Sequence, residues 1–332
     1  KKTISKIFRY RQKTSEEVDQ ELLQEQKKSI NNLEKSIQNQ QQQQKELAKI
    51  QQDLQNKKTI NWNDKKKVQR FIQRQEQYKN MMQRQTEVMQ ENLDEKKEEN
   101  ENLQNKKEEL QKRIEELKKL DKQQRLLDEI QKLAEKLNKD DLVKKAKELA
   151  QQNKQQERSL EKTLELVKRF YIEQKTMQIA NKLATLSKQQ DSIQQKVDST
   201  LDDQKAIKKE FDSLQKELEE LGIDNERLKE PMELPDTEQE QETIDKELNK
   251  AEENLEKQAQ LSAKKNQKKS SKKMKDMSTK MQQAMLEMEG ESMEENMEDL
   301  RKILENLVTF SFNQENLMNA FDEISTGHPD FG

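Results

Sequence analysis

The sequence contains no cysteine, a single histidine, four glycines and three prolines, and only 4% of its 332 residues are aromatic. Without cysteine, the chain has neither disulfides nor thiolate metal sites. Four scattered glycines cannot form the glycine-rich loop that cradles a nucleotide phosphate. Because hydrophobic residues make up only 29% of the chain, it lacks the apolar side chains that one large globular core requires.

Residues typical of catalytic and metal sites are equally scarce. His328 is the only histidine and stands between Gly327 and Pro329, so a catalytic triad or a zinc site would lack partners. Acidic pairs such as Asp140 with Asp141 are typical of helix caps and solvated surfaces, because acid–base catalysis needs a desolvated pocket that separates two pKa values. We therefore predict no enzyme activity, no cofactor, no metal ion and no small-molecule substrate.

The abundant residues favour helices. Charged residues make up 39% of the chain, and most of the remainder is Gln, Leu and Asn. The scarcity of glycine and proline separates this composition from that of disordered chains. Lys plus Arg (64) nearly balances Asp plus Glu (67), so the chain as a whole has no field that would attract nucleic acid or an anionic membrane. No run approaches the roughly 20 apolar residues that span a bilayer.

A heptad seam runs through residues 179–221 without a break in its alternating steps of three and four residues. Its members are Ile179, Leu183, Leu186, Gln190, Ile193, Val197, Thr200, Gln204, Ile207, Phe211, Leu214, Leu218 and Leu221. A similar seam with several glutamines runs through residues 23–54, and a glutamine seam is weak by itself. This pattern predicts helices that pack against one another along one apolar stripe, while their other faces are exposed to solvent.

Turn and cap residues divide the chain into segments. We expect an all-α fold in which two long helices form an antiparallel coiled-coil hairpin, with a smaller helical bundle at the C-terminal end. Each arm would measure roughly 110–120 Å at about 1.5 Å per residue, and Gly222 would cap the second arm. A continuous helix through the turn near residue 138 is the alternative. The segments are a basic lead-in (1–13), a first coiled-coil helix (14–56), the two long arms (63–138 and 140–221), a proline-containing linker (222–240), a Lys/Met-rich helix (241–289) and an apolar C-terminal helix (292–326).

The C-terminal helix has a wider apolar surface than pairing with one other helix would bury. This width predicts contact with several neighbours, either in this bundle or in a partner protein. The candidate partner-binding residues are Leu300, Ile303, Leu307, Phe310, Phe312, Leu317, Phe321 and Ile324.

A lysine run is the sharpest local charge feature, and it consists of Lys264, Lys265, Lys268, Lys269, Lys272, Lys273 and Lys275. These side chains could grip a phosphate backbone, with Ser270 and Ser271 as hydroxyl donors. No arginine or aromatic residue is interleaved for base reading or stacking. We therefore favour a solvated helix face, or a partner for the acidic stretch 287–299, over a nucleic-acid site.

Methionines from Met274 to Met297 recur at helical spacing, which favours core packing over an adaptable binding groove. Trp62 follows Asn61 at a turn, and we expect it to cover the end of the first helical turn; a binding hot spot is the alternative.

Residues 159–175 with 179–183, and residues 300–331 with the core Ser-Phe-Asn-Gln-Glu-Asn-Leu-Met, resemble a family of large envelope proteins of Bacteroidetes. Members have transmembrane helices near the N-terminus, a β-rich region and then a Gln/Lys/Glu-rich helical region, and they have no assigned function. The resemblance covers most of this chain as the helical region. It implies a tether to the inner membrane through a segment missing here and a location on the periplasmic side, and it carries over no site residues. The absence of an initiator methionine fits a fragment of a larger protein.

The function predicted from these features is that of a structural or scaffolding coiled coil that assembles protein partners at a bacterial cell envelope. The alternatives are a nucleic-acid-associated coil acting through Lys264–Lys275 and a client-holding chaperone. A cytoplasmic location is the alternative compartment. The seams serve pairing within and between chains alike, so homo-oligomerisation stays open.

Overall fold

The computed structural model describes residues 13–95, 101–118, 121–196 and 200–287, and all regular secondary structure in these ranges is helical. The predicted all-α fold class is therefore confirmed. The helices are α1 (Ser15–Asn56), α2 (Trp62–Asp94), α3 (Glu101–Lys118), α4 (Asp121–Glu135), α5 (Lys139–Gln195), α6 (Leu201–Glu226) and α7 (Glu238–Glu256). A further helix, called helix 260–287 below, follows α7.

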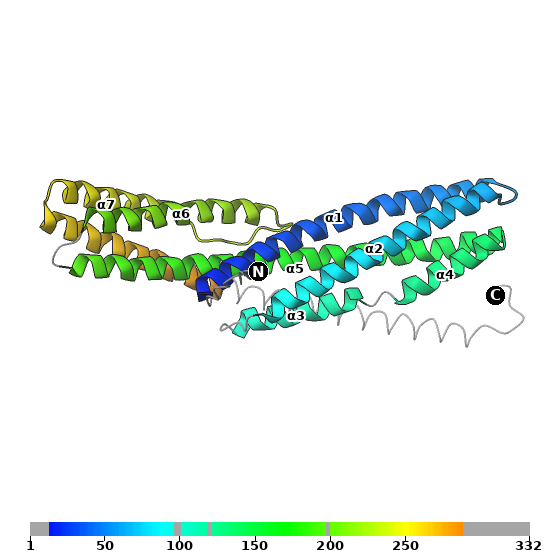
Figure 1. Ribbon diagram of the computed structural model, residues 1–332, viewed down its shortest axis with the longest axis horizontal. Coiled ribbons are helices and arrows are strands. Elements are labelled where there is room, and N and C mark those ends of the chain that lie inside the picture. The colour runs from blue at the N-terminus through cyan, green and yellow to red at the C-terminus, as the bar shows by residue number, and fades with distance from the viewer. Residues whose placement is uncertain (1–12, 96–100, 119–120, 197–199, 288–332) are drawn as a thin grey trace, which may run out of the picture.

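The helices form two four-helix bundles that share α5 and lie end to end in one rod (Figure 1). In the first bundle, α1 and the successive helices α3 and α4 pack beside the first part of α5, and α2 packs on α1, α3 and α4. In the second bundle, α6 and helix 260–287 pack beside the last part of α5, and α7 packs on these two helices. Neighbours in the second bundle are antiparallel, because Gln190 contacts Gln204 and Lys182 contacts Glu217.

Polar caps start several of these helices. At α1, the Glu17 backbone N–H donates to Thr14 Oγ1 at 3.2 Å, and the Thr14 N–H donates to Glu17 Oε2 at 3.0 Å. Asn61 with Asp64 caps α2 in the same reciprocal way. Such caps satisfy backbone donors that have no partner inside the helix, so they fix where each helix begins.

The long hairpin expected from the sequence is not observed. The expected arm 63–138 is divided, and α3 runs back along α2, with Gln111 Nε2 donating to Asp94 Oδ1 at 2.7 Å. The expected arm 140–221 is also divided, because α5 ends at Gln195 and α6 begins after its cap Thr200. No glycine or proline marks either reversal. The first falls in the charge-rich stretch 91–102, which was interpreted as a solvated part of the arm, and the second lies inside an unbroken heptad.

Two further boundaries differ from expectation. Gly222 is not a helix cap, because α6 continues through it to Glu226, and the linker into α7 occupies only residues 227–237. The expected helix 241–289 is divided at residues 257–259, where Gln258 adopts a left-handed φ of 57°. A non-glycine residue with positive φ is uncommon, and that is why the sequence did not reveal this turn.

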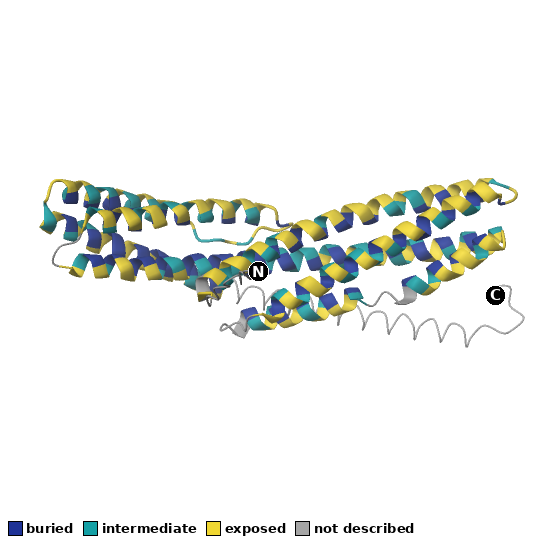
Figure 2. Cartoon of the chain, viewed as in Figure 1, coloured by how far each residue is buried: buried dark blue, intermediate teal, exposed yellow. Residues whose placement is uncertain are grey.

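The apolar seam residues of α5 and α6 face the interior (Figure 2), whereas Thr200 is exposed and Val197 lies outside the described residues. Ile179, Leu183 and Phe211 are each 0% exposed. One apolar cluster runs from Leu33 in the first bundle to Met277 in the second, and a separate cluster fills the outer end of the first bundle. The two bundles therefore share a single core across their junction.

A layer of amides separates the two apolar clusters of the first bundle. Its members come from four different helices and are Gln40 (α1), Gln75 (α2), Gln123 (α4) and Asn153 (α5), all buried. Gln123 Nε2 donates to Asn153 Oδ1 at 2.9 Å and to Gln75 Oε1 at 3.3 Å. Since these groups find partners only when the helices are in register, the layer specifies the alignment of the bundle.

The second bundle has its own amide layer. Gln190 of α5 and Gln204 of α6 exchange hydrogen bonds of 3.0 and 3.2 Å. Gln267 Nε2 also donates to Gln204 Oε1 at 3.0 Å. The glutamines of the heptad seam therefore pair across several helices of one chain.

Candidate functional site

The features that stand out in the described ranges are charged surfaces and a junction between helices. Within them, no group of three or more histidine or acidic side chains is placed to hold a metal ion. None of the helices described is long and apolar enough to cross a bilayer. The three features with unusual geometry or charge are the junction between the bundles, the lysine face of helix 260–287 and the free end of the first bundle.

The middle of α5 is enclosed on every side. Four consecutive residues, Phe170, Tyr171, Ile172 and Glu173, are all buried. Because one helical turn takes 3.6 residues, this leaves no face of the turn toward solvent. The segment lies where helices of both bundles meet, because Tyr171 contacts Asp224 of α6 and Glu173 contacts Lys106 of α3.

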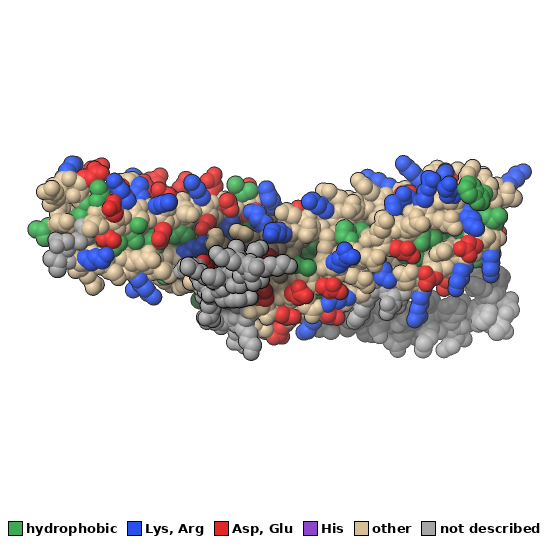
Figure 3. Space-filling model, in the orientation of Figure 1, with side chains coloured by type: hydrophobic (Ala, Val, Ile, Leu, Met, Phe, Trp, Pro, Cys, Tyr) green, Lys and Arg blue, Asp and Glu red, His purple; other side chains and the backbone are tan. Residues whose placement is uncertain are grey.

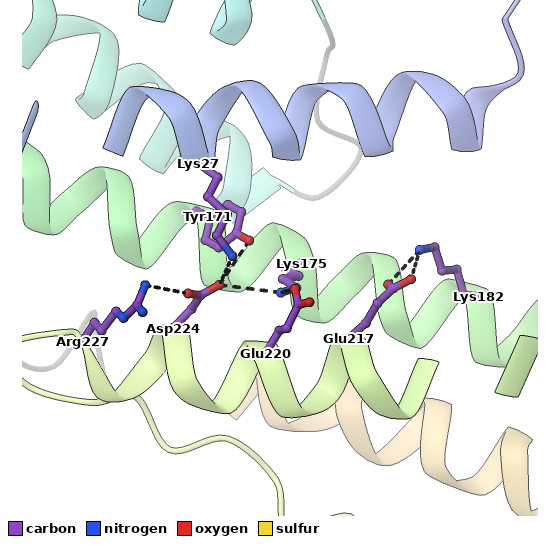
Figure 4. A network of polar contacts seen from close by, with 8 residues as sticks. All are labelled: Lys27, Tyr171, Lys175, Lys182, Glu217, Glu220, Asp224 and Arg227. Atoms are coloured by element: carbon purple, nitrogen blue, oxygen red, sulfur yellow. Dashed lines mark hydrogen bonds and ion pairs between the residues drawn. The ribbon is translucent and has the colours of Figure 1, made fainter. Parts of the chain in front are cut away.

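A network of charged groups surrounds this segment (Figure 4). Asp224 Oδ2 of α6 lies 3.2 Å from Lys27 Nζ of α1 and 3.6 Å from Lys175 Nζ of α5. Tyr171 donates its hydroxyl to the same oxygen at 3.3 Å. The side chains of Lys175 and Asp224 are only 7% and 11% exposed. One buried carboxylate therefore joins α1 of the first bundle to α6 of the second through α5.

Tyr171 stays protonated in this setting. Burial raises the pKa of its phenol well above the ordinary value, and the negative charge of Asp224 acts in the same direction. On another side of α5, the buried Glu173 pairs with Lys106 of α3. Both contacts bind helices together, and the adjoining cavity of about 30 Å³ is far smaller than a ligand site. We interpret the network as a structural feature that holds the helices of the two bundles together.

The lysine run lies on the outer face of helix 260–287, with every side chain exposed or half-buried. Lys269 is 3.7 Å from Glu247 of α7, and this is the one ion pair that the run makes with carboxylates in the described ranges. The neighbouring α7 carries eight Asp or Glu and two Lys, whereas helix 260–287 carries eight Lys and two acids. A basic strip therefore lies beside an acidic one.

Ser270 and Ser271 do not join the lysines, so the hydroxyl donors considered for the alternative, a phosphate-binding site, are not on this face. Both are buried, and Ser271 exchanges hydrogen bonds with Ser187 of α5 at 2.9 and 3.2 Å. Ser278 Oγ donates to the Ala180 carbonyl at 2.7 Å. Small residues here let the backbones of α5 and helix 260–287 approach closely. The signal in the sequence was the spacing of Ser271 and Ser278, which lie seven residues apart and therefore on one face of the helix.

The methionines of this helix are buried, as their spacing indicated, with Met274 and Met277 at 0% exposure. Trp62, in contrast, is 66% exposed and lies with its ring 4.9 Å from Lys66 Nζ, so it does not cover the turn as expected. Leu137, 46% exposed, is near the same end of the rod, because the adjacent Lys139 bonds to the Lys57 carbonyl. Elsewhere on the face in Figure 3, positive and negative side chains are interspersed.

The predicted partner-binding residues, from Leu300 to Ile324, lie outside the described residues, as does His328. What sequence reasoning missed is the junction network. The available signal was Phe170, Tyr171 and Ile172 in succession, which occupy every face of a helical turn and are followed at once by Glu173 and Lys175.

Comparisons with models of known protein families, with curated proteins and with solved structures find no match to this chain.

Proposed function

We propose that this chain is a non-enzymatic structural protein, a helical rod that holds partner proteins at a fixed spacing at a bacterial cell envelope. The observation that supports this most is the unbroken α5, whose 57 residues span both bundles. At about 1.5 Å per residue it measures roughly 85 Å. A helix that both bundles share, together with a continuous core, keeps the two ends of the molecule at a fixed distance from each other. A spacer requires such a fixed distance.

Partner proteins would bind the apolar residues between 300 and 324. The test is affinity purification of the full chain from its native cells after chemical cross-linking, comparing the wild type with a Leu307→Asp/Phe310→Asp double variant. Leu261→Asp is the matched control, because Leu261 is 87% exposed and lies on the described rod. The proposal predicts that the double variant loses partners that the control retains. Equal recovery of partners by all three proteins would refute this surface.

The envelope location rests on the resemblance of residues 159–183 and 300–331 to the Bacteroidetes family. Since the chain has no cysteine, a single Gln155→Cys substitution creates a unique thiol at an exposed position. In intact cells with a permeabilised outer membrane, a membrane-impermeant maleimide should label this thiol if the rod is periplasmic. Labelling only after lysis would place the rod in the cytoplasm and contradict the proposal.

A second candidate function is binding of nucleic acid through the lysine run, and the observation that favours it is the exposed, largely unpaired basic strip. Replacing Lys264, Lys268 and Lys272 with glutamine should then weaken binding. It should also reduce the slope of log affinity against log salt concentration by about three. A control variant removes Lys205, Lys246 and Lys250 from other helices. Absence of binding to DNA and RNA at low salt would exclude this function.

A further inference from the structure

A groove of about 700 Å³ opens between α6 and the segment 231–237 that leads into α7. The apolar part of its lining is Leu218, Leu221, Leu234, Pro235 and Met281, and Leu221 and Met281 are nearly fully buried behind the others. The volume falls within the roughly 300–1,000 Å³ of ordinary ligand sites. None of these residues belongs to the junction network, the lysine run or the predicted partner surface.

The rim of the groove is acidic. Asp212, Glu219 and Glu238 line it, together with Asp236 and a single lysine, Lys216. In the described ranges no lysine or arginine forms an ion pair with the first three, of which Asp212 is half-buried and Glu219 and Glu238 are exposed. Unpaired carboxylates around an apolar lining favour an occupant that is both cationic and apolar.

Gly222 forms part of the wall and has no role in the fold. It lies inside α6, and a Cβ built on it would meet nothing within 4 Å. Its φ is not positive, so its backbone does not require glycine. Glycine destabilises a helix interior relative to alanine. A glycine that the backbone conformation and the packing do not require therefore indicates a role in binding. Here it leaves the α6 backbone bare along the groove.

The opposite wall is held in place before any ligand arrives. Asn225 Nδ2 donates to the Met232 carbonyl at 2.8 Å, and the Met232 N–H donates to Asn225 Oδ1 at 2.9 Å. Pro231 and Pro235 further restrict this segment. A wall fixed in this way loses little conformational freedom on binding.

We propose that this groove binds a short basic peptide segment of a partner protein. One bulky apolar side chain of the peptide packs on the half-buried Leu218 and Leu234, and flanking lysine or arginine side chains reach Asp212 and Glu219. The peptide backbone lies against the bare helix at Gly222. This site is separate from the partner surface at residues 300–324 and does not depend on the rod acting as a spacer.

The test uses the full chain and a fluorescein-labelled synthetic peptide, Arg-Leu-Arg-Phe-Arg-Leu, in fluorescence anisotropy titrations. Asp212→Asn/Glu219→Gln should weaken binding about tenfold or more, whereas the control Glu210→Gln/Glu226→Gln, with the same charge change on the same helix outside the groove, should stay within about twofold. Gly222→Met should abolish binding without lowering the melting temperature, because methionine is the better helix former.

Three results would overturn the proposal. They are absence of saturable peptide binding to the wild type, equal weakening by the two charge variants, which would indicate non-specific attraction, and unchanged binding by Gly222→Met. Loss of cross-linked partners in the Leu307→Asp/Phe310→Asp variant bears only on the other surface, so the two proposals fail independently.

Discussion

Replacing Asp224 with asparagine should weaken the junction between the bundles more than any other single charge change there. The carboxylate contacts Lys27, Tyr171 and Lys175, and its other oxygen lies 3.5 Å from Arg227 Nη1. The asparagine side chain would keep the shape of the aspartate and could still accept a hydrogen bond from the tyrosine. What is removed is the negative charge that compensates a buried ammonium group.

The size of the effect follows from exposure. The side chains of Lys27 and Arg227 are 42% and 63% exposed, so each pairing contributes less than about 1 kcal/mol. Lys175 is only 7% exposed, and breaking a buried pair by removing one partner costs about 3–5 kcal/mol. Because Glu220 still lies 3.5 Å from Lys175, we expect a value near the lower limit, about 3 kcal/mol.

Glu220→Gln is the matched control. Glu220 and Asp224 lie at nearly the same distance from Lys175 Nζ, 3.5 and 3.6 Å, but Glu220 is 62% exposed. Its loss should lower the free energy of unfolding by less than about 1 kcal/mol. Urea unfolding followed by circular dichroism measures both variants. If Asp224→Asn costs no more than Glu220→Gln, burial does not decide the strength of this network and our account of the junction is wrong.

Three further predictions concern single positions. Gly222→Ala should raise the free energy of unfolding by about 0.5–1 kcal/mol in thermal or urea melts, because its Cβ meets open space inside a helix, and destabilisation would refute this. Gln204→Leu should lower that free energy by about 2–3 kcal/mol, since the buried amide of Gln190 loses its partner; a neutral result would show that the amide layer is not coupled. Burial opposes ionisation of Asp64, but its pairing with Lys57 prevails and holds its pKa below the ordinary 3.8. Its stabilising contribution is therefore present above about pH 5 and lost as the pH falls through the lowered pKa, and Asp64→Asn should flatten the pH dependence of stability in that range.

The sequence predicted burial better than it predicted chain direction. Ile179, Leu183 and Phe211 were placed on the seam and are buried. The reversal between α5 and α6 was missed, because a heptad continued past a turn keeps its phase, and Thr200 satisfied the seam spacing while serving as a cap with Asp203. A Thr-x-x-Asp sequence ahead of an apolar run was the available signal.

A periodic sequence pattern shows which residues are buried, but it does not show which helices contact one another, and most of the candidate sites depend on those contacts. The lysine face could be read from the sequence, because seven lysines in a short helical stretch have few places to lie except on the surface. The junction and the groove could not, because both depend on which segments of the folded chain lie side by side. Asp224 and Lys175 are far apart along the chain, and only the reversal of direction between α5 and α6 brings them into contact.

The central claim is that α5 runs unbroken through both bundles as the axis of one rod. Gln155 and Gln189 lie on α5 on either side of the buried segment and are exposed, and the natural chain has no cysteine to interfere with labelling. Spin labels on a Gln155→Cys/Gln189→Cys variant, measured by double electron–electron resonance, should give one narrow distance distribution near about 50 Å. A broad distribution, or a main distance below about 35 Å, would mean that the helix bends or breaks at the junction and would contradict the claim.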